Sequence, residues 1–114
     1  MAIDFQDVNE NLRRIVISER LDVAGTDAIS TKFAALAAGS TRRVLVDLTG
    51  VTFLASMGIR ALVTNAKAQH LRGGRMVLFV GANSGVAKTL ETTGIDVLIP
   101  MFTDAAEAEK AVLA

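Results

Sequence analysis

One serine stands where an extended segment passes into a helix. Ser56 follows the apolar piece Val51–Leu54 and precedes a pattern in which apolar residues recur at spacings of three and four. We therefore predict Ser56 at the N-cap of this helix, where a hydroxyl accepts a hydrogen bond from a free backbone N–H. The same position suits a phosphate, because the positive end of the helix dipole faces it. Capping alone is the simpler interpretation, since serine is a favoured N-cap residue.

Hydrolytic chemistry at Ser56 is poorly supported by its neighbours. A nucleophile elbow needs glycine two residues before and two residues after the serine. Gly58 fits the later position, but Leu54 occupies the earlier one. The single histidine, His70, would lie roughly 20 Å from Ser56 along a continuous helix, whereas a serine–histidine hydrogen bond spans about 3 Å. We predict that His70 is a surface residue near the helix end and that the protein is not an enzyme; catalysis at Ser56 is the third of three hypotheses.

Other cofactor and metal sites lack their usual signatures. The segment Gly81–Lys88 resembles a phosphate-binding loop but lacks the GxxxxGK spacing, so a strand-to-helix turn with a cap explains it better. The chain has no cysteine, which excludes disulfides and thiolate ligands. No set of histidines or carboxylates has the spacing of metal ligands. We therefore predict no cofactor and no metal.

Length and charge restrict the class of protein further. The 114 residues fit one domain, predicted over residues 1–114. The formal net charge is zero, and a nucleic-acid binder normally shows a basic face, so no direct nucleic-acid binding is expected. The polar N-terminus lacks a signal-peptide pattern, and no apolar run approaches the roughly 20 residues of a membrane helix. The expected protein is cytoplasmic, without membrane insertion.

Alternating strands and helices must position Ser56. The predicted strands are Ile3–Val8, Leu12–Ser18, Val44–Leu48 with a second apolar piece Val51–Leu54 after a turn at Thr49-Gly50, Arg75–Val80 and Val97–Ile99. The predicted helices run from a cap at Thr26 or Asp27 to Gly39, from Ser56 to Leu71–Gly74, from Asn83-Ser84 to Gly94, and from Asp104, with Thr103 as cap, to Ala114. Asp22 and Asp47 fall near strand ends, where turn and capping roles are expected. This alternation predicts an α/β fold with parallel pairing in its later part.

Several motifs in this order resemble the STAS domain family, named for sulfate transporters and anti-sigma factor antagonists. The strongest are Val46–Val51 and Phe53–Ile59, which resemble the family signature around the start of its second helix. Further similarities are Arg20–Asp22, Gly73-Gly74 and Leu90–Ile95, so the resemblance covers essentially the whole chain. It implies a STAS-like single domain with a four- to five-stranded mixed sheet and about four helices. A free-standing domain of this length most resembles the bacterial anti-sigma factor antagonists.

The resemblance also implies a function. In this family the unphosphorylated antagonist binds an anti-sigma factor that is also a serine kinase, and so frees a sigma factor for transcription. The kinase phosphorylates a serine at the start of the second helix, the complex dissociates, and a phosphoserine phosphatase resets the switch. Ser56 stands on that position. The implied partners are therefore the kinase and the phosphatase, with the free protein a monomer or weak dimer.

The predicted partner surface surrounds the start of this helix. It comprises Asp22, Ser56, Met57, Arg60, Ala61, Thr64 and Asn83. Met57 would be an adaptable apolar contact if it is exposed, and otherwise a core residue. Arg60 would contribute a charge contact or lie on a solvated helix face.

Ala55 leaves a second hypothesis open. The family commonly has aspartate just before the phosphorylated serine, and this chain has Ala55. A missing carboxylate fits a divergent switch, but it fits equally a permanent STAS scaffold or a subunit of a stress-signalling or lipid-transport ATPase complex. Binding that survives a phosphomimetic substitution at Ser56 would distinguish the scaffold from the switch.

Overall fold

The computed structural model describes residues 2–39 and 43–114. Its elements in chain order are β1 (Ile3–Asn9), β2 (Leu12–Leu21), α1 (Val23–Ala37), β3 (Arg43–Leu54), α2 (Ser56–Leu71), β4 (Arg75–Phe79), α3 (Ser84–Thr92), α4 (Ile95–Leu98), β5 (Met101–Phe102) and α5 (Ala105–Leu113). Within the described residues, five strands form one sheet in the order β1-β2-β3-β4-β5. The hairpin partners β1 and β2 are antiparallel, and every later neighbour is parallel, because a helix connects each of these strands to the next. The predicted α/β mixed sheet is confirmed.

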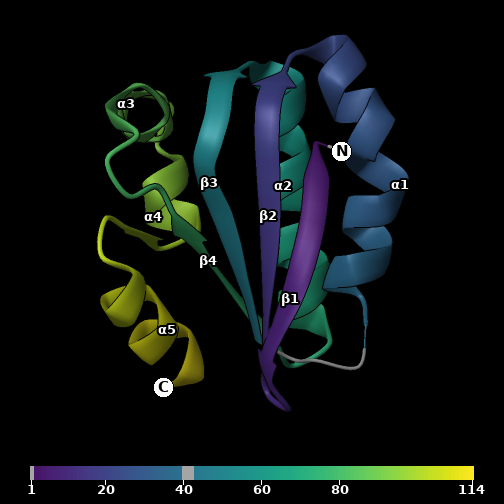
Figure 1. Ribbon diagram of the computed structural model, residues 1–114, viewed down its shortest axis with the longest axis vertical. Helices are drawn as coiled ribbons and strands as arrows, with labels where there is room; N and C mark the ends of the chain where they lie inside the picture. Colours follow the sequence, from purple (N-terminus) through teal and green to yellow (C-terminus); the bar gives the residue numbers. More distant parts are fainter. Residues whose placement is uncertain (1, 40–42) are drawn as a thin grey trace.

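Helices cover the two faces of the sheet unequally. The larger apolar cluster lies between the sheet and α1, α2 and α3, with Phe33, Leu62 and Leu90 fully buried in it. A smaller cluster on the other face joins Leu45 and Val77 to Val112 of α5. In Figure 1, α2 lies behind the strands, while the near faces of β1 and β2 carry no helix. The part of the chain that the structure describes contains no helix long and apolar enough to cross a membrane.

The end of the sheet differs from the prediction. The predicted strand at Val97–Ile99 is wrong: residues Ile95–Leu98 form the one-turn helix α4, and the last strand follows Pro100. The apolar run resembled a buried strand, but Val97 and Leu98 are 85% and 65% exposed. Pro100 directly precedes the first residue of β5, a position where a proline without an N–H is tolerated. Its carbonyl accepts a hydrogen bond from Leu78 N at 2.8 Å.

The predicted turn at Thr49-Gly50 lies inside a continuous strand. The pairing of β3 with β2 is irregular here, because the register shifts between Val16 and Ser18. Asp47 lies in the middle of β3, where its carboxylate accepts hydrogen bonds from Thr49 and from Arg14 Nη2, the latter at 2.6 Å. Burial raises the pKa of Asp47, but these hydrogen bonds outweigh it and hold the pKa below its usual value. Asp47 thus links β3 to Arg14 of β2 from within the strand and does not lie at the strand end.

Three predicted helix caps differ from the observed ones: the predictions fall too late in the chain at α1 and α2, and one residue too early at α5. The N-caps are Asp22 for α1, Ala55 for α2 and Asp104 for α5, in place of Thr26 or Asp27, Ser56 and Thr103. Each observed cap has extended backbone, and the two aspartates accept hydrogen bonds from backbone N–H groups of the first turn. At α1 and α2 the favoured cap residues further along were misleading, since the helix begins where the backbone leaves the extended region.

Candidate functional site

Two helices begin side by side at the carboxyl ends of β2 and β3. Leu21 and Leu54, the last residues of these strands, are partners in the parallel register. Asp22 and Ala55 follow them as the N-caps of α1 and α2. Ala55 N donates to Leu21 O at 3.1 Å, which ties the start of α2 to the end of β2. The positive ends of both helix dipoles therefore meet at one edge of the sheet.

A glycine in the first turn of each helix permits this close approach. A Cβ on Gly25 would lie 1.9 Å from Arg20 O, and a Cβ on Gly58 would lie 2.8 Å from both Leu21 Cβ and Leu54 Cδ1. Distances below 3.0 Å require the neighbouring atoms to move. The first turns of both helices are consequently in direct contact with the ends of β2 and β3.

Ser56 is the exposed first residue of α2. The cap before it, Ala55, makes no side-chain hydrogen bond, and the first turn of α2 contains no acidic residue. Within residues 2–39 and 43–114, Ser56 Oγ makes no hydrogen bond, and the first intrahelical bond runs from Ile59 N to Ala55 O. The start of α2 therefore presents an accessible hydroxyl beside backbone N–H donors that no side chain caps.

The start of α1 is occupied by its own carboxylate. Asp22 Oδ1 accepts a hydrogen bond from Gly25 N at 2.8 Å, and Arg20 Nε donates to Asp22 Oδ2 at 3.3 Å. The Gly25 N–H, and after it the Arg20 guanidinium, hold the pKa of Asp22 below its usual value. An added anion would meet a satisfied and already negative site at α1.

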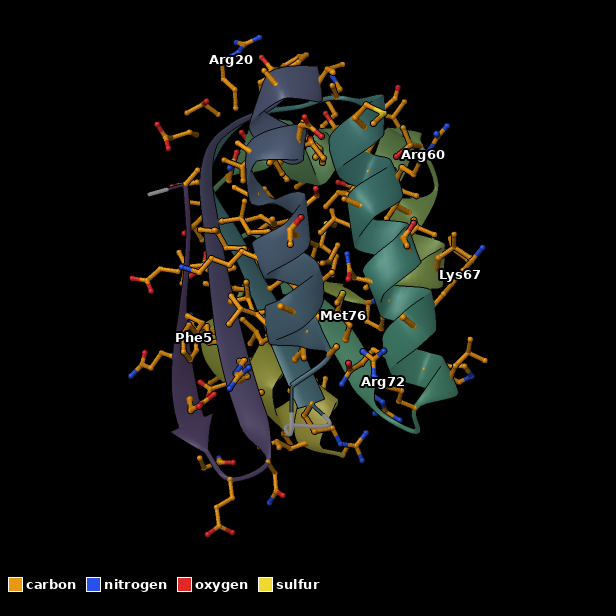
Figure 2. All side chains as sticks on the ribbon, turned by 90° about the vertical axis from the view of Figure 1, so that its right-hand side faces the viewer. Phe5, Arg20, Arg60, Lys67, Arg72 and Met76 are labelled. Carbon is orange, nitrogen blue, oxygen red and sulfur yellow. The ribbon has the colours of Figure 1, made fainter. Side chains whose placement is uncertain are left out.

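Three apolar side chains at or next to the starts of α1 and α2 are exposed. Phe53, Met57 and Val23 are 43%, 39% and 66% exposed. The Arg20 guanidinium carbon lies 4.6 Å from the centroid of the Phe53 ring, a cation–π geometry. Figure 2 shows Arg20 and Arg60 at the same end of the molecule. The edge thus combines apolar contact area with positive charge, as partner surfaces do.

Sequence reasoning missed Phe53, Arg20 and Val23 as members of this surface. A signal for Phe53 was present, because Phe53 and Leu54 are adjacent in a strand and must face opposite sides. Leu54 is buried, which leaves Phe53 outside. Arg20 carried no comparable signal, since its stacking on Phe53 depends on the pairing of β2 with β3.

Four of the seven predicted partner residues are exposed on α2. Ser56, Arg60 and Thr64 follow one another at intervals of four residues and so lie along one side of the helix, with Met57 beside them. For Met57 the structure gives the surface position, not the core position. Arg60 forms no ion pair with any described residue.

The other three predicted residues have structural roles. Asp22 caps α1, and Ala61 packs against the main apolar cluster. Asn83 caps α3 through Val86 N, and its Nδ2 donates to Leu48 O and Val51 O at 3.0 and 2.7 Å. Their membership of a partner surface stays a prediction.

The histidine considered as a base for Ser56 lies far from it. His70 lies exposed in the last turn of the same helix, as predicted. The described residues contain no group of three or more histidines and carboxylates that would hold a metal ion. What the geometry does offer is a hydroxyl that another protein's active site can reach.

Comparison with known proteins identifies the family. The model of the STAS domain family matches residues 6–108. No curated protein sequence is significantly similar to the chain. An anti-sigma-factor antagonist (STAS) domain protein from Planctomyces limnophilus is 26% identical, with 98% of each chain covered and a TM-score of 0.81. An anti-sigma factor antagonist from Mycobacterium paratuberculosis is 20% identical, with 98% of this chain and 93% of that chain covered and a TM-score of 0.81.

A third similar structure was solved with phosphate attached. The Bacillus cell fate determinant SpoIIAA, in its phosphorylated form, is 15% identical, with 96% of this chain and 99% of that chain covered and a TM-score of 0.69. The fold therefore accommodates phosphorylation in at least one protein that shares it. With the family model matching most of the chain, the protein belongs to the STAS domain family.

Proposed function

We propose that this protein is an anti-sigma factor antagonist whose contact with a serine-kinase anti-sigma factor is controlled by phosphorylation of Ser56. The unphosphorylated form binds the kinase and frees a sigma factor for transcription; the phosphorylated form releases the kinase, and a phosphoserine phosphatase restores binding. One observation carries the proposal: Ser56 is exposed at a helix start that lacks a side-chain cap, in a chain with the STAS fold. The similarity to two proteins described as anti-sigma factor antagonists supports it.

A phosphate at Ser56 is compatible with the folded domain. It adds about −1.5 to −2 charges and three acceptor oxygens at the positive end of α2. The backbone N–H groups of the first turn are uncapped and can donate to it. Arg60, one turn further along, has no competing ion pair among the described residues and can pair with the phosphate. The modification therefore leaves α2 intact.

The same phosphate would disrupt a complex. Phe53 and Met57 expose apolar surface next to Ser56, which a partner would bury. Burying a dianion in such a contact carries a desolvation cost unless the partner supplies matching donors. A loss of about 3 kcal/mol weakens binding more than 100-fold. The switch acts on the interface while the fold persists.

Ala55 supports a second candidate, a non-switching STAS scaffold or complex subunit. No carboxylate precedes Ser56, and Ala55 gives α2 no side-chain cap. In a scaffold, Ser56 would be only the first residue of α2, and a charge there would change binding little.

Capture of partners from native lysate tests the proposal. The wild-type chain should retain a kinase-type anti-sigma factor, whereas Ser56→Asp should lose it. The matched control is Ser84→Asp: Ser84 is the exposed first residue of α3, the same helix position at a capped start. Ser84→Asp should bind like the wild type, and Ser56→Ala should bind but resist release by ATP.

Two results would contradict the switch. Equal capture by wild type and Ser56→Asp would favour the scaffold, and absence of phosphate on Ser56 after incubation with the captured kinase and ATP would remove the regulatory step. Phosphopeptide mass spectrometry measures the second directly.

A further inference from the structure

A groove lies at the opposite end of α2 from Ser56, where the sheet is incomplete. The two residues of β5 pair with Leu78 and Phe79, so the first half of β4 pairs with β3 on one side and has no strand on the other. The resulting space is flanked by the second half of α2, by α4 and its connection to β5, and by α5. Its volume is about 910 Å³, within the range of small-molecule sites, roughly 300–1,000 Å³.

The walls of this groove are mainly apolar. They are formed by Val63, Ala66, Met76, Leu98, Ile99 and Phe102. Leu98 is 65% exposed at the margin of the groove, which explains how a large apolar residue of α4 can remain unpacked. An apolar ligand would cover it and gain the free energy of burial.

Basic side chains gather at the amino-terminal ends of β3 and β4. Arg43 and Arg75, the first residues of these strands, are register partners and line the groove, so two like charges stand on adjacent strands. Arg75 Nη1 donates to Ala111 O at 3.0 Å, but no described carboxylate pairs with either arginine. Lys67 and His70 of α2 also line the groove, and no acidic side chain does. Figure 2 shows Lys67 on the side of α2 turned away from α1.

We propose that this groove binds a long-chain carboxylate, with the acyl chain along the apolar walls and the carboxylate between Arg43 and Arg75. Guanidinium groups bind carboxylates through opposite charge and paired N–H donors. The apolar walls match an acyl chain in the same molecule. Along α2 the groove extends from Val63, roughly 10 Å from Ser56, to Leu71, roughly 20 Å away, and does not include Ser56, so the proposal does not rest on the proposed function.

The shape favours this ligand over larger partners. An anionic membrane would need a flat or convex apolar face, whereas these residues line a partly open hollow. A peptide strand adding to β4 would find a free edge only from Arg75 to Val77, about 10 Å at the usual rise per residue.

Displacement of a fluorescent polyene fatty acid from the whole chain measures binding. Laurate should displace the probe, dodecanol should compete about fivefold less well for lack of the charge, and acetate should not compete. Leu98→Asn should weaken laurate binding about tenfold, while the matched Val97→Asn should not, because Val97 is exposed next to it but does not line the groove. Lys67→Glu should weaken binding about fivefold, and Lys88→Glu, an exposed lysine on α3, should not.

Four results would overturn the proposal, three of them in the behaviour of laurate and vesicles and one in peptide capture. The first three are failure of laurate to displace the probe, equal laurate affinity in Leu98→Asn and Val97→Asn, and sedimentation with phosphatidylglycerol vesicles without laurate binding. Capture of a peptide that laurate does not displace would assign the groove to strand addition instead. Thermal unfolding of each variant confirms that it is folded, and none of these measurements involves an anti-sigma factor.

Discussion

The starts of α1 and α2 have the same backbone arrangement but differ in their capping residues. Each helix follows a strand end, begins after an extended cap residue and has glycine as its third residue, at Gly25 and Gly58. At α1 the cap is Asp22, whose carboxylate accepts the Gly25 N–H. At α2 the cap is Ala55, which accepts no N–H through its side chain, and an exposed serine follows.

This difference separates a structural helix start from one available for regulation. A carboxylate in the cap satisfies a backbone donor and neutralises part of the dipole, so nothing further is needed. Without it, the donors and the positive potential remain available to a phosphate. The start of α1 is thus satisfied within the domain, whereas the start of α2 is where the proposed phosphate on Ser56 would lie.

The largest expected effect on stability comes from disrupting the close contact between a helix start and the strand end beneath it. Gly25→Ala places a methyl group 1.9 Å from Arg20 O and should destabilise the protein by about 2–3 kcal/mol, since backbone must move to admit it. Urea unfolding measures the loss. Gly85→Ala in the first turn of α3 is the control: its Cβ would meet Asn83 Oδ1 at 3.9 Å, an ordinary contact, and alanine favours the helix. Equal stability of the two variants would contradict the close packing of Gly25 against the Arg20 carbonyl.

A smaller effect comes from making α2 resemble α1. Ala55→Asp should stabilise the protein by about 1 kcal/mol, because Ala55 already has the extended backbone of a cap and Gly58 N is positioned as Gly25 N is. The midpoint of urea unfolding should rise. Ala38→Asp, the same substitution at the C-cap of α1, should instead lower it slightly, because a negative charge is unfavourable there. A decrease for Ala55→Asp would show that the start of α2 is not open.

The smallest effect is the pH dependence of the Asp22 cap. The folded-state pKa of Asp22 lies below its usual value, so the charged carboxylate contributes stability above the unfolded-state pKa of about 3.9, and this contribution is lost as the pH falls through the folded-state pKa. Asp22→Asn keeps a capping oxygen but cannot titrate. Wild type should therefore exceed Asp22→Asn in stability at neutral pH, and the difference should shrink as the pH falls through the folded-state pKa of Asp22. A difference independent of pH would mean that the charge of Asp22 is not involved.

Most elements could be predicted from local pattern, while their ends could not. The 3.6-residue period around Leu62 and the β-branched run at Val44 identified α2 and β3. The position of Ser56 was wrong by one residue, because serine's preference for the N-cap is weaker than the backbone geometry imposed by β3. Val97 and Leu98 suggested a buried strand because apolar composition does not show whether a residue is covered.

The sequence by itself determined the kinds of elements, their order and the serine that leads into α2. These follow from periodicity, turn residues and glycine, which act over a few residues. Only the tertiary structure decided that Asp22 and Ala55 are neighbours, that Arg20 stacks on Phe53, and that Arg43 and Arg75 stand side by side. Each of these depends on strand register, which is fixed by packing between residues distant in the chain, and no local pattern encodes it.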